Sequence, residues 1–235
     1  MSGEISHDET PQIDEEKIKA TTLLGMPFTI TTYTLPRETE SYVEEVLTTL
    51  LKLVEQEKLR DYLVYCVQEL AVNAKKANTK RVYFTERGLD IDNLEDYKLG
   101  METFKDDTLS NIAHYLNLQK EKGLYVKLVF QIIKQILQIE VRNNSALTKP
   151  ELTRIHNKLS LSRQYTSFEE AFLSIIDESE GAGLGIVVVV LMLKKIGLDK
   201  DCIDIMGTDK ETIIRINIPL DKVQFPEELP QLDSP

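Results

Sequence analysis

Cysteine, basic residues and long apolar runs are all scarce in this 235-residue sequence. The two cysteines, Cys66 and Cys202, are too few for a disulfide framework and lie in apolar segments, so we expect a reducing compartment. The longest apolar run, Ile186 to Leu193, is far shorter than the roughly 20 residues that a membrane-spanning helix needs. The first ten residues, MSGEISHDET, have neither a basic start nor an apolar stretch, which predicts no secretory signal. We therefore expect a cytoplasmic protein with no membrane partner.

Acidic residues outnumber basic ones by 39 to 28, giving a net charge of −11 at pH 7. This balance argues against non-specific binding to nucleic acid or to an anionic membrane, although a nucleotide in a local pocket stays open. A hydrophobic fraction of 42% and a charged fraction of 29% are typical of a globular protein. We predict a disordered acidic lead-in over residues 1–20, one α+β domain over 21–220, and an extended tail over 221–235.

The spacing of the apolar residues predicts most of the secondary structure. The expected elements are a strand over 26–36, helices over 38–56 and 61–78, a hairpin over 124–144 that turns near Lys134–Gln135, helices within 145–180, and a hairpin over 202–220 that turns near 208–210. One helix over 124–144 is the alternative, but the Val, Ile and Phe content favours strands. In the helix over 61–78, a continuous apolar stripe marks the face toward the core: Leu63, Cys66, Val67, Leu70, Ala71, Ala74 and Ala77.

Two further segments separate these elements. Residues 85–123 are mixed and charged, with helical fragments, and we interpret them as an insertion and as the best candidate for recognition of a partner protein. Residues 145–180 carry two capping boxes, Thr148 with Glu151 and Ser167 with Glu170, which predict ordered helices.

A polar row on the helix over 61–78 is the first candidate for chemistry. Glu69, Asn73 and Lys76 share one face because they are four and three residues apart. A carboxylate can orient or deprotonate a water, an amide oxygen can bind Mg²⁺, and an ammonium group can bind a phosphate. A solvated face of an ordinary amphipathic helix is the simpler reading of the row alone.

The second candidate is the stretch EGAGLGIVVVVLMLKKIG, in which Gly181, Gly183 and Gly185 precede an apolar run. Glycines let backbone N–H groups approach an anion, and a helix that begins near Leu184 would add the positive end of its dipole. A turn into a strand is the alternative, since IVVVV is strong strand sequence. Two lysines followed by Gly197 are typical of a helix end and favour the helix.

Taken together and in this order, ELAVNAKK and EGAGLGI resemble the histidine-kinase-like ATPase superfamily, which includes sensor histidine kinases, anti-sigma-factor serine kinases, gyrase-type topoisomerases and heat-shock chaperones. The layout from TITTYTLP to VQELAVNAKKAN looks most like the anti-sigma kinases. The resemblance covers about residues 26–220. It implies a Bergerat-type fold, a two-layer α/β sandwich in which a mixed β-sheet has helices on one face, with residues 145–180 as the lid over ATP.

The resemblance also implies roles for individual residues. Glu69 matches the catalytic acidic residue, Asn73 the Mg²⁺ ligand, and Lys76 a lysine that reaches the phosphates. The remaining cofactor-binding positions are the second glycine box, Gly181, Gly183, Leu184 and Gly185, together with Asn143 at the adenine contact. At the first glycine box, Asn143 stands where the family has Asp, and Ser145 and Leu147 stand where it has glycines. An Asn oxygen still accepts the adenine hydrogen bond, while its amide also donates.

We therefore expect an ATP-binding regulatory domain that uses Mg²⁺, with a protein kinase acting on a regulatory partner as one form. The alternative is a signalling adaptor without catalysis, which the altered first glycine box favours; a chaperone-like or topoisomerase-like ATPase ranks third. Self-phosphorylation on histidine is not expected, since the one histidine upstream of the motifs is His7. A homodimer is compatible with the sequence.

Overall fold

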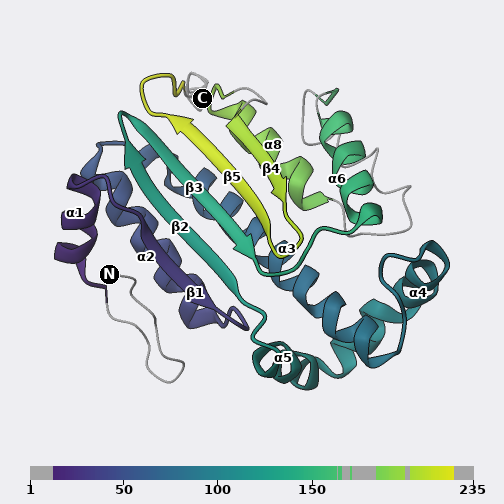
Figure 1. Ribbon diagram of the computed structural model, residues 1–235. Coiled ribbons are helices and arrows are strands. Elements are labelled where there is room, and N and C mark those ends of the chain that lie inside the picture. The colour runs from purple at the N-terminus through teal and green to yellow at the C-terminus, as the bar shows by residue number, and fades with distance from the viewer. Residues whose placement is uncertain (1–12, 163, 166–169, 171–183, 199–201, 225–235) are drawn as a thin grey trace, which may run out of the picture.

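The fold is a five-stranded antiparallel sheet with helices packed on one face (Figure 1). The computed structural model describes residues 13–162, 164–165, 170, 184–198 and 202–224. The sheet has the strand order β1-β2-β3-β5-β4. Its strands are β1 (Phe28–Thr32), β2 (Val126–Ile133), β3 (Ile136–Asn143), β4 (Ile203–Gly207) and β5 (Thr212–Pro219). The helices of the described residues are α1 (Glu15–Leu23), α2 (Arg37–Leu53), α3 (Arg60–Glu86), α4 (Leu94–Ser110), α5 (Ile112–Glu121), α6 (Lys149–Ser162) and α8 (Leu184–Lys195), with a short 3₁₀ turn at Glu57–Leu59.

Both predicted hairpins are confirmed, and they account for most of the sheet. β2 and β3 are joined by Lys134 and Gln135, whose φ angles of 48° and 65° are those of a type I′ turn. β4 and β5 pair around the turn that begins at Thr208. Every strand pair is antiparallel, so the expectation of a mixed sheet was wrong. The long connections return each strand beside its neighbour in the opposite direction, and no described strand makes a parallel crossover.

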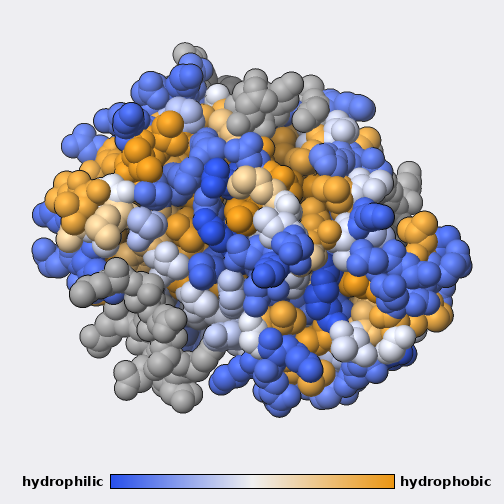
Figure 2. Space-filling view, viewed as in Figure 1, coloured by the Kyte–Doolittle hydropathy of each residue, from blue (hydrophilic) through white to orange (hydrophobic). Residues whose placement is uncertain are grey.

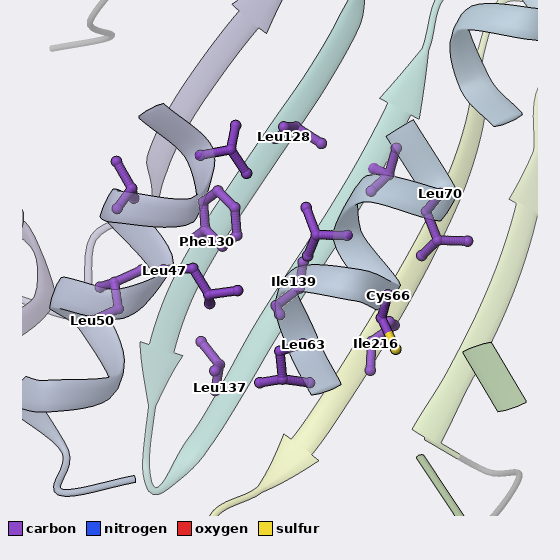
Figure 3. Packing of buried hydrophobic residues seen from close by; sticks show 14 of the residues in the cluster. Leu47, Leu50, Leu63, Cys66, Leu70, Leu128, Phe130, Leu137, Ile139 and Ile216 are labelled. Atoms are coloured by element: carbon purple, nitrogen blue, oxygen red, sulfur yellow. The ribbon is translucent and has the colours of Figure 1, made fainter. Parts of the chain in front are cut away.

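The main core lies between the sheet and the helices α2, α3 and α8 (Figure 3). Side chains of a strand alternate between its two faces, so Leu137, Ile139 and Val141 of β3 point to the helices. The predicted apolar stripe of α3 packs against them. Its first six members, from Leu63 to Ala74, are buried, and its last member, Ala77, is half-buried. Burial of each Leu or Ile contributes roughly 1.5–3 kcal/mol, which makes this layer the main support of α3.

The opposite face of the sheet carries polar pairs among apolar side chains (Figure 2). Glu140 of β3 is only 3% exposed there, because Arg215 donates to its Oε1 at 2.6 Å and Arg142 donates to its Oε2 at 2.8 Å. One arginine of the neighbouring strand and one of the same strand thus let this carboxylate remain charged in a buried setting.

Three boundaries differ from the sequence predictions. The lead-in was expected to reach residue 20, but α1 begins at Glu15, with Asp14 as its N-cap. Ile18 holds α1 on the core with no exposed surface. α3 runs to Glu86 instead of ending near residue 78, because α4 and α5 cover its second half. The predicted insertion therefore starts inside a helix.

α4 and α5 form a second cluster on the end of α3. Tyr83 and Phe84 of α3 are buried, and the Tyr83 ring meets that of Phe104 edge-on at 5.2 Å. A Cβ atom on Gly100 of α4 would lie 2.5 Å from Cζ of Phe84, so the two helices approach closely because residue 100 has no side chain. Within the described residues, none of these helices combines the length and apolar character needed to cross a membrane.

Candidate functional site

A cleft of about 140 Å³ opens between α3, α6, the start of α8 and the helix-facing ends of β4 and β5. α3 and α6 each contribute one wall. In Figure 1, α3 lies behind the sheet and α6 lies beside β4 and α8. The apolar part of the lining consists of Leu70, Ala74, Ala77, Leu147, Ile155, Ile186, Ile205 and Ile214. The polar part consists of Asn73, Lys76, Lys80, Arg81, Glu151, Arg154, Lys158 and Thr212. Five cations and one carboxylate thus line a cleft in a chain of net charge −11.

The predicted polar row of α3 lies against the first turn of α8. A Cβ atom added to Gly185 would be 2.5 Å from Oε2 of Glu69 and 2.8 Å from Nδ2 of Asn73. The close approach is possible because residue 185 is glycine. Asn73 and Lys76 line the cleft, whereas Glu69 lies beside it at the Gly185 contact. Two motifs that are more than a hundred residues apart in the sequence therefore meet at one point.

The alternative reading of the glycine stretch, a turn into a strand, is excluded because residues 184–195 form α8. The helix ends as predicted: Gly197 has a φ of 78°, and the N–H of Leu198 donates to the carbonyl of Leu193. The start of α8, which is the positive end of its dipole, lies beside Glu69 and Asn73 of α3. Gly181 and Gly183 lie outside the described residues, and Leu184 is the first residue of α8.

Glu69 also influences the side chains one turn before it on α3. Burial, together with the nearby negative charge of Glu69, raises the pKa of Cys66 to about 12. The same two causes raise the pKa of Tyr65 above its usual value. Both groups are therefore protonated at neutral pH.

Glu151 is the one carboxylate of the cleft lining, and it binds two cations of α3. Arg81 donates from Nη2 to Oε2 at 2.6 Å and from Nη1 to Oε1 at 3.2 Å, and Lys80 Nζ is 3.5 Å from Oε1. Burial raises the pKa of Glu151, but the hydrogen bond and charge of Arg81 and the charge of Lys80 outweigh it, and the pKa lies below its usual value. The predicted capping box is confirmed, since Thr148 and Glu151 exchange hydrogen bonds at 3.1–3.3 Å.

Asn143 takes part in a buried network beside the cleft and does not line it. Its Nδ2 donates to Oδ1 of Asn78 at 3.2 Å, and Ser145 Oγ donates to the same oxygen at 2.7 Å. Asn78 in turn donates to the carbonyl of Tyr125, and Thr212 donates to the carbonyl of Ser145. Asn143 and Ser145 therefore fix the end of β3 to α3. A base contact from Asn143 stays a prediction.

Three residues at the site were not predicted from the sequence: Lys80, Arg81 and Asn78. Lys80 follows Lys76 by four residues and so extends the polar row by one turn, a signal that was available but lay beyond the expected helix end. Arg154 and Lys158 also line the cleft, and they belong to residues 145–180, the segment predicted as a lid over ATP. Most of that segment beyond α6 lies outside the described residues.

Comparison with known proteins gives one informative match. The chain is 49% identical over 207 residues to an uncharacterized protein of Treponema pallidum (strain Nichols). The match covers 88% of this chain but only 40% of that relative. No protein-family model matches the sequence. No solved structure matches it either.

Proposed function

We propose that the cleft binds ATP together with Mg²⁺ and that the protein is an ATP-binding regulator, of which a kinase acting on a partner protein is one form. The observation that carries the proposal is the contact of Gly185 with Glu69 and Asn73 beside a cleft lined by five cations. A glycine that lets a helix start approach a carboxylate and an amide, next to excess positive charge, suits the phosphates of a nucleotide.

The side chains of the cleft fit the phosphate end of such a ligand. Asn73 offers an amide oxygen for Mg²⁺, and Lys76 offers a cation one turn further along α3. No group of three or more His, Cys, Asp or Glu side chains in the described part of the chain is placed to hold a metal ion. Magnesium usually keeps several waters and shares phosphate oxygens, so one amide ligand is compatible with its binding. When bound, the ion would neutralise phosphate charge.

Glu69 is the residue that we assign to proton transfer. Its carboxylate lies at the start of α8, where the row of α3 and the helix end converge. From there it would accept the proton of an attacking water or hydroxyl group and would itself become neutral. Most of the rate enhancement would come from positioning and from the cations of the cleft.

The volume of the cleft adds one requirement. Sites for small ligands usually measure about 300–1,000 Å³, whereas this cleft measures about 140 Å³. A nucleotide therefore enters only if α6 moves away from α3. The proposal thus predicts an opening motion of the α6 wall.

Calorimetric titration with a non-hydrolysable ATP analogue and Mg²⁺ tests the proposal. Asn73→Ala is expected to weaken binding at least tenfold, because the amide ligand is lost. Asn117→Ala, an exposed asparagine on α5, is the matched control and should leave the affinity unchanged. Absence of binding to the folded wild-type protein, or equal affinity for both variants, would refute the proposal.

A second candidate function, an adaptor that binds a partner protein, is favoured by a groove of about 570 Å³ between α3, α4 and α5. Its lining comes from three helices: Val72, Lys75, Lys76 and Thr79 of α3; Met101, Glu102, Phe104, Lys105, Asp106, Thr108 and Leu109 of α4; and Ile112, Tyr115, Leu116 and Gln119 of α5. A groove between three helices can accept one face of an amphipathic fourth helix. The α3 wall contributes two lysines and no carboxylate, so the occupant we infer is an amphipathic helix of a partner protein with acidic residues on that side.

Binding of acidic amphipathic helical peptides, measured by fluorescence anisotropy, tests the adaptor function. Ile112→Asp should abolish binding, because Ile112 is 55% exposed and lines the groove. Leu94→Asp changes a residue of α4 that is 64% exposed but lies outside the groove, and it should bind normally. Equal binding to both variants would exclude the groove as the docking site.

A further inference from the structure

Glu151 occupies an unusual position for a carboxylate, since it is 7% exposed in a cleft whose other charged residues are all cations. Lys80, its partner at 3.5 Å, is also 7% exposed. Arg81 joins the same wall and donates to the carbonyl of Ala146 at 2.5 Å in addition to binding Glu151. The ion pair therefore joins α6, and the loop before it, to α3.

A buried carboxylate is stable only when its charge is compensated, and the same holds for the two cations. Removal of Glu151 would leave Lys80 and Arg81 facing each other in a site with no other carboxylate in its lining. Any anion of suitable size that reached these two residues could replace Glu151 at little electrostatic cost. Phosphate suits such a site because Arg can bind two of its oxygens and Lys adds a point charge.

We propose that Lys80 and Arg81 form an anion-binding subsite of the cleft, that Glu151 fills it in the described structure, and that a phosphate group of the ligand replaces Glu151 there. The inference rests on the proposed function and extends it, because replacement of Glu151 releases the contact that holds α6 against α3. The subsite explains how a cleft of about 140 Å³ could open for a nucleotide.

The arrangement of α6 agrees with such an exchange. Glu151, Arg154, Ile155 and Lys158 follow one another at helical spacing, and all four line the cleft. If Glu151 leaves the subsite, the two cations of α6 still lie on the face that borders the ligand. α6 would thus change from a closed position, in which Glu151 binds Lys80 and Arg81, to an open position, in which a phosphate of the ligand binds them.

Titration of the full chain with pyrophosphate, and separately with the ATP analogue and Mg²⁺, tests the subsite. Glu151→Gln should tighten pyrophosphate binding tenfold or more, because the Glu151 carboxylate no longer competes with pyrophosphate for Lys80 and Arg81. Arg81→Gln should weaken it by a similar factor. Glu95→Gln changes an exposed carboxylate of α4 and should have no effect.

A second variant covers the case in which Glu151→Gln fails to fold, which circular dichroism would show. Thr148→Ala keeps the carboxylate and the backbone N–H that donates to it, but removes the hydrogen bond from the Thr148 hydroxyl to Oε2 of Glu151. A gain of about threefold in pyrophosphate affinity is expected. Unchanged or weaker pyrophosphate binding in Glu151→Gln, or in Thr148→Ala where Glu151→Gln does not fold, would overturn the subsite.

The two titrations separate this inference from the proposed function. Binding of the ATP analogue that depends on Asn73 but is insensitive to Glu151 and Arg81 would refute the subsite and leave the nucleotide site intact. Pyrophosphate binding that responds to Glu151 and Arg81, without any binding of the ATP analogue, would support the subsite and refute the nucleotide site.

Discussion

The contact between Gly185 and Glu69 yields a quantitative prediction about stability. Gly185→Ala replaces the poorer helix former by the better one, a gain of up to about 1 kcal/mol in a helix. The new methyl group, however, would be 2.5 Å from Oε2 of Glu69 and 2.8 Å from Nδ2 of Asn73, and overpacking of this kind costs roughly 1–3 kcal/mol. We therefore expect a net loss of about 1 kcal/mol, whereas a glycine without this contact would give a gain.

A double-mutant cycle isolates the contact. Glu69→Ala removes the nearer of the two atoms, so Gly185→Ala should destabilise the fold by about 1 kcal/mol less in the Glu69→Ala background. The overpacking that is left comes from the contact with Asn73. Urea unfolding followed by circular dichroism measures all four proteins, provided that the dependence on urea is unchanged. Gly207→Ala is the control, because its methyl group would meet Leu147, and its effect should add to that of Glu69→Ala. Effects of Gly185→Ala and Glu69→Ala that add to within about 0.3 kcal/mol would refute the contact.

Three further predictions follow from single features of the structure. Replacing Lys134–Gln135 by Asn-Gly should raise the free energy of unfolding by about 0.5–1 kcal/mol, because both residues have positive φ, and a lower urea midpoint would contradict this. The pKa of Glu151 is lowered in the folded state, so its contribution to stability is present above the usual glutamate pKa and is lost as the pH falls through the folded value. The difference in urea midpoint between wild type and Glu151→Gln should therefore shrink from pH 6 to pH 3. A difference in urea midpoint that does not change with pH would refute this. Cys66, with a pKa of about 12, should resist thiol reagents at pH 8 until the protein is unfolded by urea, so rapid labelling of Cys66 in the native state would show that its burial is wrong.

The elements that the sequence predicts well are those set by local periodicity. Both hairpins, α2, the start of α3 and the end of α8 carry apolar spacing or terminal signals that are visible over one or two turns. α1 was missed because its stability comes from one distant contact, the burial of Ile18 in the core, in an otherwise polar segment. The extension of α3 was missed for the same kind of reason, since Tyr83 and Phe84 need α4 and α5 to cover them.

The candidate site shows the same division. Spacing places Glu69, Asn73 and Lys76 on one face, and the glycine stretch suggests the partner that the structure brings to them. The pairing of Glu151 with Lys80 and Arg81 has no local signal, because 70 residues separate Arg81 from Glu151. Only the position of α6 across the cleft reveals that a capping residue also compensates two cations.

The 27 residues of α3 make it a rod about 40 Å long that belongs to two structural units at once. Its first half packs against the sheet and against α8, and its second half packs against α4 and α5. Lys76 lies near the middle and lines both the cleft and the groove. A tilt of α3 by about 5° about Asn73 would displace its far end, about 20 Å away, by about 2 Å. A ligand in the cleft and a partner in the groove would therefore contact the same helix, within one turn of each other at Lys76.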